Sequence, residues 1–295
     1  MVALLLLVTG ITAGCPPAAA ISIKEEQQLS REFLVVLKQH LQIIDDPEIN
    51  SYIDGIGQKI LAALPPQPFT YHFYVIKEDV YNAFAIPAGH IFINSGLLLA
   101  MDNEDELAGI LSHEISHVIC RHVSQRIDRS KNINLATMAG MVAGIFLGAA
   151  AGEPAAAQGL IFGSAAAGQS MSLAFSRDDE AQADQLGLGY LNKAGYSAEG
   201  LLDILKKIRS RQWYGSDQVP TYLMTHPAVE QRIVDIDSWI ASHKQPHPTA
   251  EAQARSSARL HKITLRLRAL YGDQDTGLQY FQSAVTRNPD DSDIA

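Results

Sequence analysis

The sequence has 295 residues, of which 47% are hydrophobic and 19% are charged, and its formal net charge is −9. This composition excludes a disordered or uniformly membranous chain and predicts a sizeable core, built as one domain with an appendage or as two small domains. Nucleic acid is excluded as a partner, because phosphate binding requires clustered Lys and Arg and the sequence has no basic stripe.

The first 14 residues are almost wholly apolar and end in Thr-Ala-Gly before Cys15. Small residues before a Cys are typical of a bacterial lipobox, in which the Cys is lipidated and becomes the mature N-terminus. We therefore expect residues 1–20 to be a leader, the protein to be exported to the periplasm or cell envelope, and a lipidated Cys15 to anchor it to a membrane. No Lys or Arg precedes the apolar stretch, so a leader that is simply cleaved, or a misassigned start site, stays open as an alternative.

Two amphipathic helices are expected within residues 24–64. The second begins at Asp46-Pro47, where an N-cap acceptor precedes Pro at the first helical position, and it ends at Pro65-Pro66. Its apolar residues recur at helical spacing, at Ile49, Ile53, Ile56, Ile60 and Leu64.

Two strands are expected next, at residues 69–76 and, after a Pro-Ala-Gly turn, at residues 91–94, because both segments are rich in β-branched and aromatic residues. From Asn103 onward the pattern is helical, and Glu106 is the expected capping partner of Asn103. The apolar face of this helix consists of Leu107, Ile110, Leu111, Ile115, Val118 and Ile119.

Residues 132–176 are mostly Ala, Gly and other apolar residues, with Glu153 as their only charge. We interpret them as a helical hairpin that turns at Glu153 and packs as a flap over the catalytic domain. The alternative is insertion into a membrane, since the two arms approach the length of a bilayer span and small residues allow close helix packing. Residues 177–241 return to mixed helices, and residues 242–250 are a linker to a charged helical tail.

The sequence HEISH at residues 113–117 lies inside the helix that follows Asn103. His113 and His117 are four residues apart and project from one face, so their ring nitrogens can meet one tetrahedral Zn²⁺. Glu114 lies beside the metal position but not on it, which suits a general base for a metal-activated water. The alternative is a purely structural pair of histidines, and the capped amphipathic helix argues against it.

A catalytic zinc needs a third protein ligand and one open position. His122 follows His117 by five residues and is expected to point elsewhere on the helix. The better candidate is Glu180, in the sequence DDEAQAD at residues 178–184, with Asp184 on the same face of a second helix. We expect Glu180 to bind the metal and Asp184 to hydrogen-bond the distal nitrogen of a ligand His. The alternative is a solvated acidic face.

HExxH followed later by ExxAD resembles metallopeptidase family forty-eight, the group that includes HtpX, BepA and the CAAX prenyl proteases. The likeness covers roughly residues 45–240, and three further segments match it: NAFAIPAGHI at 82–91, HVICRH at 117–122, and His226-Pro227 followed by Arg232. One departure is His90, where the family usually has a second Gly; this departure concerns the turn geometry and not the chemistry.

The resemblance implies an α+β, predominantly helical gluzincin fold with a small β-sheet, which we assign to residues 21–245. It also implies that the strand Asn82-Ala83-Phe84-Ala85 borders the cleft. An edge strand there would bind an extended peptide substrate through main-chain hydrogen bonds. The alternative is an ordinary sheet strand without a ligand.

The late motif of the family implies that His226 and Arg232 approach the metal. Arg232 is then expected to stabilise the oxyanion that develops during peptide hydrolysis. His226 either hydrogen-bonds the same species or occupies the open zinc position as a latch in a resting state. A His that caps a helix beside Pro227 is the third possibility.

The tail at residues 246–295 has Gly277, Phe281, Ala284 and Pro289 at the spacing of half a tetratricopeptide repeat. We therefore expect a helical, TPR-like tail that docks on the protease or on a partner, because one repeat cannot bury its own apolar face. A plain amphipathic helix is the alternative.

The predicted function is a zinc-dependent endopeptidase, with one Zn²⁺ per chain, that cleaves exported or envelope proteins in protein quality control. The alternative is an envelope protein-assembly or chaperone-like factor with secondary proteolysis, which the tail and the hairpin favour. An integral membrane prenyl-protein protease is disfavoured, because the sequence shows no series of spanning helices.

Overall fold

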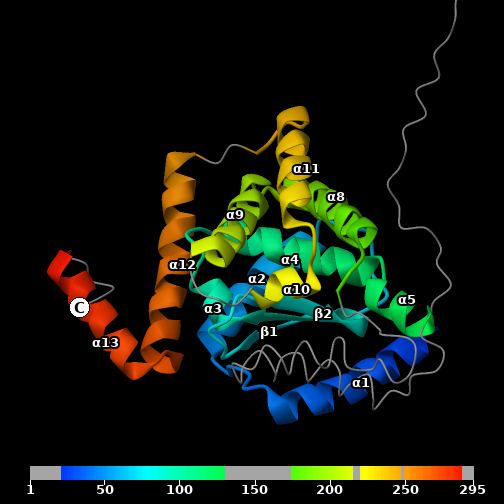
Figure 1. The fold of residues 1–295 in the computed structure, drawn as a ribbon, viewed down its shortest axis with the longest axis horizontal. Helices are drawn as coiled ribbons and strands as arrows, with labels where there is room; N and C mark the ends of the chain where they lie inside the picture. The colour runs from blue at the N-terminus through cyan, green and yellow to red at the C-terminus, as the bar shows by residue number, and fades with distance from the viewer. Residues whose placement is uncertain (1–20, 130–173, 215–219, 247–248, 288–295) are drawn as a thin grey trace, which may run out of the picture.

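The computed structural model describes residues 21–129, 174–214, 220–246 and 249–287 (Figure 1). The predicted leader with Cys15 and nearly all of the 132–176 hairpin lie outside these residues, and so does Pro289. Within the described ranges, no helix combines the length and the apolar character that crossing a membrane requires.

A three-stranded sheet lies at the centre of the fold, with strand order β1-β3-β2. β3 pairs in parallel with β1 and antiparallel with β2, which leaves β2 at an edge of the sheet. The sheet carries the two predicted strands together with the strand implied by the family resemblance: β1 His72–Ile76, β2 Ala83–Ile86 and β3 His90–Asn94.

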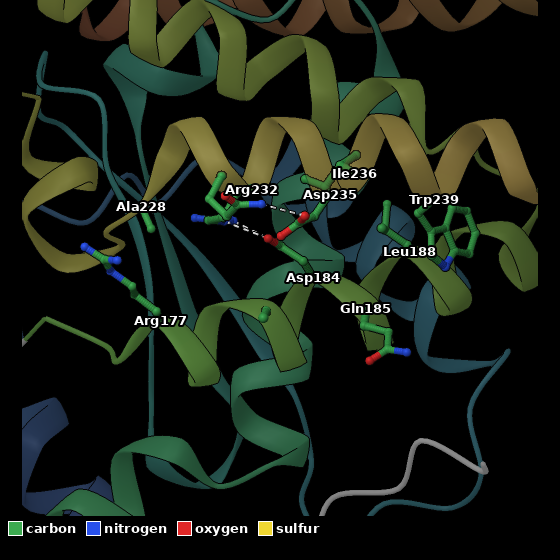
Figure 2. A pocket seen from close by; sticks show the side chains of 11 residues that line it. Arg177, Asp184, Gln185, Leu188, Ala228, Arg232, Asp235, Ile236 and Trp239 are labelled. Atoms are coloured by element: carbon green, nitrogen blue, oxygen red, sulfur yellow. Dashed lines mark hydrogen bonds and ion pairs between the residues drawn. The ribbon is translucent and has the colours of Figure 1, made fainter.

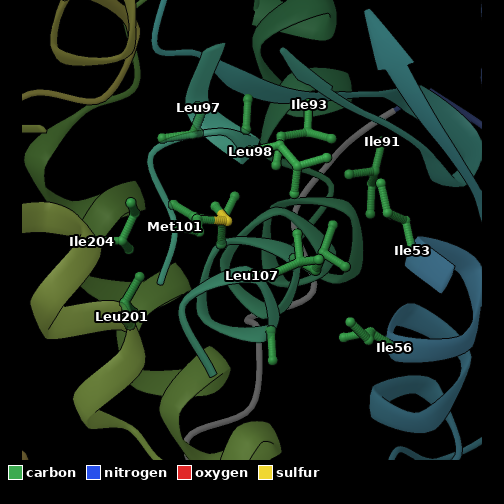
Figure 3. Close-up of a cluster of buried hydrophobic side chains, with 14 of the residues drawn as sticks. Ile53, Ile56, Ile91, Ile93, Leu97, Leu98, Met101, Leu107, Leu201 and Ile204 are labelled. Atoms are coloured by element: carbon green, nitrogen blue, oxygen red, sulfur yellow. The ribbon is translucent and has the colours of Figure 1, made fainter. Parts of the chain in front are cut away.

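Helices cover both faces of the sheet (Figure 1). Successive residues of a strand point to opposite faces. Phe92 of β3 therefore packs toward α1 (Ile23–His40), whereas its neighbours Ile91 and Ile93 join the larger core cluster on the other side. Figure 3 shows that cluster, in which Leu107 meets side chains from several elements. The remaining described helices are α2 Pro47–Leu61, η1 Pro87–Gly89, α3 Ser95–Leu98, α4 Glu104–Ile119, α5 His122–Arg129, α8 Arg177–Ala194, α9 Glu199–Tyr214, α10 Thr221–Thr225 and α11 Val229–Ser242, followed by the tail helices α12 Ala250–Tyr271 and α13 Gln274–Arg287.

The predicted helix starts are confirmed at α2 and α4. Asp46 caps α2 by accepting from the N–H groups of Glu48 and Ile49, and Pro47 is the first helical residue. Asn103 Oδ1 accepts from the Glu106 N–H at 3.1 Å, and the Asn103 amide donates to Glu106 Oε1 at 3.2 Å. Both helices begin where the sequence supplies acceptors for the unpaired N–H groups of the first turn.

α4 packs between α8 and α9 at close approach. A Cβ on Gly109 of α4 would lie 2.8 Å from the Cα of Leu201 on α9, a distance that backbone atoms do not tolerate. On the other side, the buried Ser112 hydroxyl donates to the backbone carbonyl of Gly187 on α8 at 2.8 Å. The two contacts set the position of α4 relative to both neighbours.

The turn before β3 shows how the chain accommodates His90. His90 has ordinary extended backbone, with φ −94° and ψ 119°, so it does not disturb the turn. The left-handed backbone lies instead at Ala88, with φ 62°, and at Gly89, with φ 90°. A Cβ on Gly89 would also come within 2.7 Å of the Thr70 carbonyl oxygen. The left-handed conformation has a steric cost at Ala88, which has a Cβ, and none at Gly89.

The tail begins with α12, which packs on the catalytic part of the chain. Leu260, Ile263 and Leu267 are buried in the same apolar cluster as residues of α2 and α4. α13 follows, with Leu278 58% exposed and Val285 43% exposed. The tail is helical as expected, with the two helices α12 and α13, and its likeness to a tetratricopeptide repeat stays a prediction.

Candidate metal centre

α4 carries the HEISH sequence through the most buried part of the molecule. His113 and Glu114 are 0% exposed and His117 is 1% exposed. The Nε2 atoms of the two histidines lie 3.0 Å apart, and their rings meet edge to face. The helical spacing predicted from the sequence therefore brings both imidazoles to one point.

Glu180 reaches the same point from the first turn of α8. This turn is fixed by a capping box in which Ser176 and Asp179 exchange hydrogen bonds. Glu180 Oε2 lies 3.6 Å from His113 Nε2, and Oε1 lies 3.4 Å from His117 Nε2. The three predicted ligands are thus brought together. His226 joins them, since one ligand atom from each of the four residues lies within 4.8 Å of all the others.

The donor set fits a metal cation. Ligand atoms about 2.0–2.2 Å from a tetrahedral zinc lie about 3.2–3.6 Å from one another. Among the described residues, Glu180 Oε1 and His226 Nε2 are buried and have no hydrogen-bond partner. Buried polar atoms without a partner are costly. A cation bound between the imidazoles and the carboxylate of Glu180 would remove that cost, and two nitrogens with one carboxylate suit zinc.

Asp184 lies behind the candidate ligand His113. Its Oδ1 atom is 2.8 Å from His113 Nδ1, the nitrogen that faces away from Glu180. Arg232 of α11 clasps the same carboxylate, with Nε 2.7 Å from Oδ2 and Nη2 2.8 Å from Oδ1 (Figure 2). Burial alone would raise the pKa of Asp184, but Arg232 and His113 bring it to about 2. Asp184 is therefore an anion that can hold His113 in a single orientation.

Arg232 also contacts the candidate ligand Glu180 directly. Its Nη1 atom lies 2.6 Å from Glu180 Oε2, and the whole side chain is 3% exposed. The guanidinium thus holds Glu180 and Asp184 together, which the sequence alone did not reveal. The predicted role of Arg232 as an oxyanion donor stays a prediction beside this observed one.

Burial sets the protonation of the free site. It raises the pKa of Glu114 to about 8, although Arg232 and the Ala85 N–H act in the opposite direction. Burial, together with Arg232, lowers the pKa of His113 to about 4. Burial also lowers the pKa of His117 well below its ordinary value. The histidines are consequently neutral at pH 7, which is the form that binds a metal.

His226 lies at the end of α10 and closes the site. Its Nε2 atom is 3.4 Å from Glu114 Oε1, while Nδ1 is held 2.9 Å from the Thr225 hydroxyl. The ring stacks on Tyr222 with the centroids 4.2 Å apart. This geometry keeps the free nitrogen of His226 directed at the cluster of ligand atoms.

The sequence matches peptidase family M48 over residues 44–240. The chain belongs to this family. It is 29% identical over 265 residues to the beta-barrel assembly-enhancing protease of Yersinia pestis, which covers 90% of this chain and 53% of that protein. It is 30% identical over 222 residues to a putative beta-barrel assembly-enhancing protease of Vibrio cholerae, covering 75% of this chain and 45% of that protein.

A more distant relative is the mitochondrial metalloendopeptidase OMA1 of Schizosaccharomyces pombe, 24% identical over 203 residues, or 68% of this chain and 56% of that protein. The chain therefore spans about half the length of the curated relatives it matches. The matched range agrees with the resemblance seen in the sequence. The prediction of a metalloendopeptidase is confirmed at the level of the family.

The predicted substrate strand of this M48 domain is β2 with the preceding Asn82. It packs against α4, and the Ala85 N–H lies near the Glu114 carboxylate. At the start of the strand, the Tyr81 carbonyl accepts from the Tyr222 N–H at 3.0 Å, so α10 lies beside it. The Asn82 amide is 0% exposed, and neither of its polar atoms has a hydrogen-bond partner among the described residues. Substrate binding by this strand stays a prediction.

The contacts of two residues near the candidate ligands were not predicted from the sequence. Phe175 stacks on His117, with the ring centroids 3.8 Å apart. His122 is not in the cluster of ligand atoms, but its Nδ1 atom lies 2.8 Å from Nδ1 of His117, on the side of that ring away from Glu180. The match of Arg121-His122 to the family pattern was the one signal that marked His122. No sequence pattern marked Phe175, because its contact with His117 joins residues that lie far apart in the sequence.

Proposed function

We propose that this M48 protein is a zinc-dependent endopeptidase that hydrolyses peptide bonds of exported or envelope proteins in protein quality control. The observation that carries the proposal is the convergence of His113, His117 and Glu180, with the general base Glu114 beside them. Two imidazoles and one carboxylate at tetrahedral spacing are the ligand set of catalytic zinc sites in peptidases.

Each residue has a separate task in this proposal. His113, His117 and Glu180 hold Zn²⁺, which when bound acidifies water and polarises the scissile carbonyl. Glu114 accepts a proton from the attacking water on a carboxylate oxygen and then delivers it to the leaving amine. β2 aligns the substrate backbone, because an extended peptide can add to the sheet beside its edge strand. The two product peptides leave without a covalent intermediate.

His226 is proposed to keep the enzyme at rest. A catalytic zinc leaves one position open, whereas a zinc with four protein ligands is closed to water and substrate. His226 Nε2 shares the cluster of ligand atoms, and burial lowers its pKa well below the ordinary value, so the nitrogen is available as a ligand. Withdrawal of α10 would remove His226 and would also release the Tyr81 end of the substrate strand.

The proposed location rests on the sequence and on the relatives. The apolar stretch before Cys15 has the form of an exported leader. The bacterial relatives are named beta-barrel assembly-enhancing proteases. We infer that the substrates are proteins of the bacterial envelope, and that a lipidated Cys15 or the 132–176 segment holds the enzyme at a membrane.

An assembly or chaperone-like role is the second candidate. It is favoured by α13, whose apolar residues Leu278 and Val285 are largely exposed and offer a surface for a protein partner. Binding of unfolded envelope proteins that persists after zinc removal would support this role. Degradation of the same proteins that depends on zinc would support the peptidase.

Metal analysis of the purified protein, combined with a casein-cleavage assay, tests the proposed function. We expect one zinc per chain and cleavage that stops when a chelator removes the metal. Glu114→Gln is the matched control, because it should retain zinc while turnover falls about 10²- to 10⁴-fold. Wild-type protein that binds no zinc, or that cleaves casein equally well without it, would refute the proposal.

A further inference from the structure

His122, the first residue of α5, is 1% exposed and makes hydrogen bonds with both of its ring nitrogens. Nδ1 lies 2.8 Å from Nδ1 of the ligand His117. Nε2 lies 2.9 Å from Oε1 of Gln182 and 3.7 Å from Oδ1 of Asp179, both on α8. His122 therefore connects one candidate metal ligand to the helix that supplies another.

These contacts admit one arrangement of protons when the metal is bound. His117 Nε2 faces His113 and Glu180, so this nitrogen is the one that coordinates. Its proton must then be on Nδ1, which donates to Nδ1 of His122. His122 in turn carries its proton on Nε2 and donates to Gln182 Oε1, because the side-chain oxygen of Gln can only accept. In this series of hydrogen bonds from His117 through His122 to Gln182, each N–H donor thus faces an acceptor.

The two ligand histidines are supported by partners of different charge. His113 is held by the carboxylate of Asp184, whereas His117 faces the neutral imidazole of His122. A buried His with a purely structural role needs a partner for each ring nitrogen, and Gln182 and His117 supply them. The partner at Nδ1 is, however, a nitrogen of a candidate ligand, so this contact also fixes which nitrogen of His117 is free to bind metal.

We propose that His122 is the positioning residue of His117, a neutral acceptor that fixes the tautomer and ring plane of this ligand. The proposal rests on the metal site of the proposed function. The first turns of α8 then have two tasks, since Glu180 is itself a ligand while Asp179 and Gln182 hold the residue that orients another ligand. A displacement of α8 would disturb two of the three ligands together.

The test compares three single variants of the full chain in their zinc affinity, measured by competition with a chromophoric chelator. His122→Phe keeps a ring of similar size but removes the acceptor, so zinc affinity should fall about 10- to 100-fold. His122→Gln supplies an acceptor oxygen and should recover most of that loss. His90→Phe is the matched control, because His90 contacts Tyr74 and His72 rather than a ligand; its zinc affinity should equal that of wild type.

Two further readouts separate positioning from folding. The visible absorption spectrum of the Co²⁺-substituted protein should change in His122→Phe and not in His90→Phe, because the spectrum reports ligand geometry. The Tm of the metal-free protein should fall no more in His122→Phe than in His90→Phe. If His122→Phe does not fold, Gln182→Leu replaces it; this variant frees the His122 ring and should weaken zinc binding as well.

Unchanged zinc affinity and an unchanged Co²⁺ spectrum in a folded His122→Phe or Gln182→Leu variant would overturn the proposal. That result would not contradict the proposed zinc site, because wild-type protein would still bind zinc. Wild-type protein that binds no zinc would instead overturn both this inference and the proposed function.

Discussion

Arg266 in the tail donates its Nε proton to both carboxylate oxygens of Asp46, at 3.0 and 2.9 Å, across 220 residues of sequence. Asp46 is 3% exposed and already caps α2 through the N–H groups of Glu48 and Ile49. One carboxylate thus stabilises the start of a core helix and anchors α12 to it. The contact joins α12 to α2, which packs against the helix α4 that carries His113 and His117.

Replacing Arg266 with Met should lower the free energy of unfolding by about 1–3 kcal/mol, because a buried carboxylate loses a charged hydrogen-bond partner. Although burial acts against it, the N–H of Ile49, the Arg266 guanidinium and the N–H of Glu48 lower the pKa of Asp46. A lowered folded pKa contributes stability above the ordinary value, and this contribution is lost as the pH falls through the folded pKa. The loss of unfolding free energy in Arg266→Met, measured by urea unfolding, should therefore have its full size near pH 7 and become smaller below pH 3.8.

Arg259→Met is the control for this prediction. Arg259 is also on α12, but its side chain is 66% exposed and lies 3.8 Å from Glu104. Its replacement should cost less than about 1 kcal/mol, because exposed ion pairs contribute little. Equal destabilisation by the two variants would show that the contact of Arg266 with Asp46 stabilises the protein no more than an exposed ion pair does.

Glu180→Ala and Asp184→Ala should separate a ligand from the residue that orients one. Loss of the Glu180 carboxylate should remove most of the zinc, whereas loss of Asp184 should weaken affinity or activity about 10- to 100-fold. Zinc content after dialysis measures the difference, and the exposed Asp178 supplies the control, since Asp178→Ala should match wild type. Complete loss of zinc in Asp184→Ala with retention in Glu180→Ala would reverse the two assignments.

His226→Ala tests the latch. If the latched state makes up nine-tenths of the resting enzyme, its removal should raise basal casein cleavage about tenfold, because activity follows the open fraction. A large loss of turnover would instead support a role for His226 beside the reacting carbonyl. Unchanged kinetics and zinc affinity would leave neither role standing. His243→Ala, at an exposed His after α11, should leave the rate unchanged.

Two glycines on different helices should respond oppositely to the same substitution. Gly109→Ala should destabilise the protein by about 1–3 kcal/mol, because the added Cβ would meet the backbone of Leu201 at 2.8 Å. Gly55→Ala on the exposed face of α2 meets nothing within 4 Å. It should stabilise by about 0.5–1 kcal/mol, because Ala loses less conformational entropy in a helix. Thermal unfolding of both variants measures the pair, and a stabilising Gly109→Ala would contradict the tight packing of α4 on α9.

The sequence predicted the parts of the site that depend on local spacing. His113 and His117 lie on one face of a capped helix, and so do Glu180 and Asp184 on another. The starts of α2 and α4 followed from Asp46-Pro47 and Asn103 for the same reason, since caps act within a few residues, whereas α2 ends at Leu61, before the expected stop at Pro65-Pro66. These features require no knowledge of how distant segments meet.

The remaining features depend on contacts between distant segments. Arg232 lies 48 residues from Asp184, and its grip on two carboxylates arises only when α11 packs on α8. His122 was placed on a continuous helix, but Arg121 adopts a left-handed conformation, with φ 55°, which turns α5 and brings His122 back toward His117. The left-handed conformation of Ala88 was not predicted either, because the departure from the family pattern was placed at His90.

The hydrogen bond from Ser112 to the Gly187 carbonyl joins α4 to α8 directly beside the candidate ligand His113. Its formation requires neither the metal nor any residue that binds it. Small zinc domains fold only when the metal arrives, whereas here the helices that carry the ligands are joined by their own backbone contact. Under the proposed function, zinc would then bind to a site whose two ligand-bearing helices are already joined, so folding would not depend on the supply of the metal.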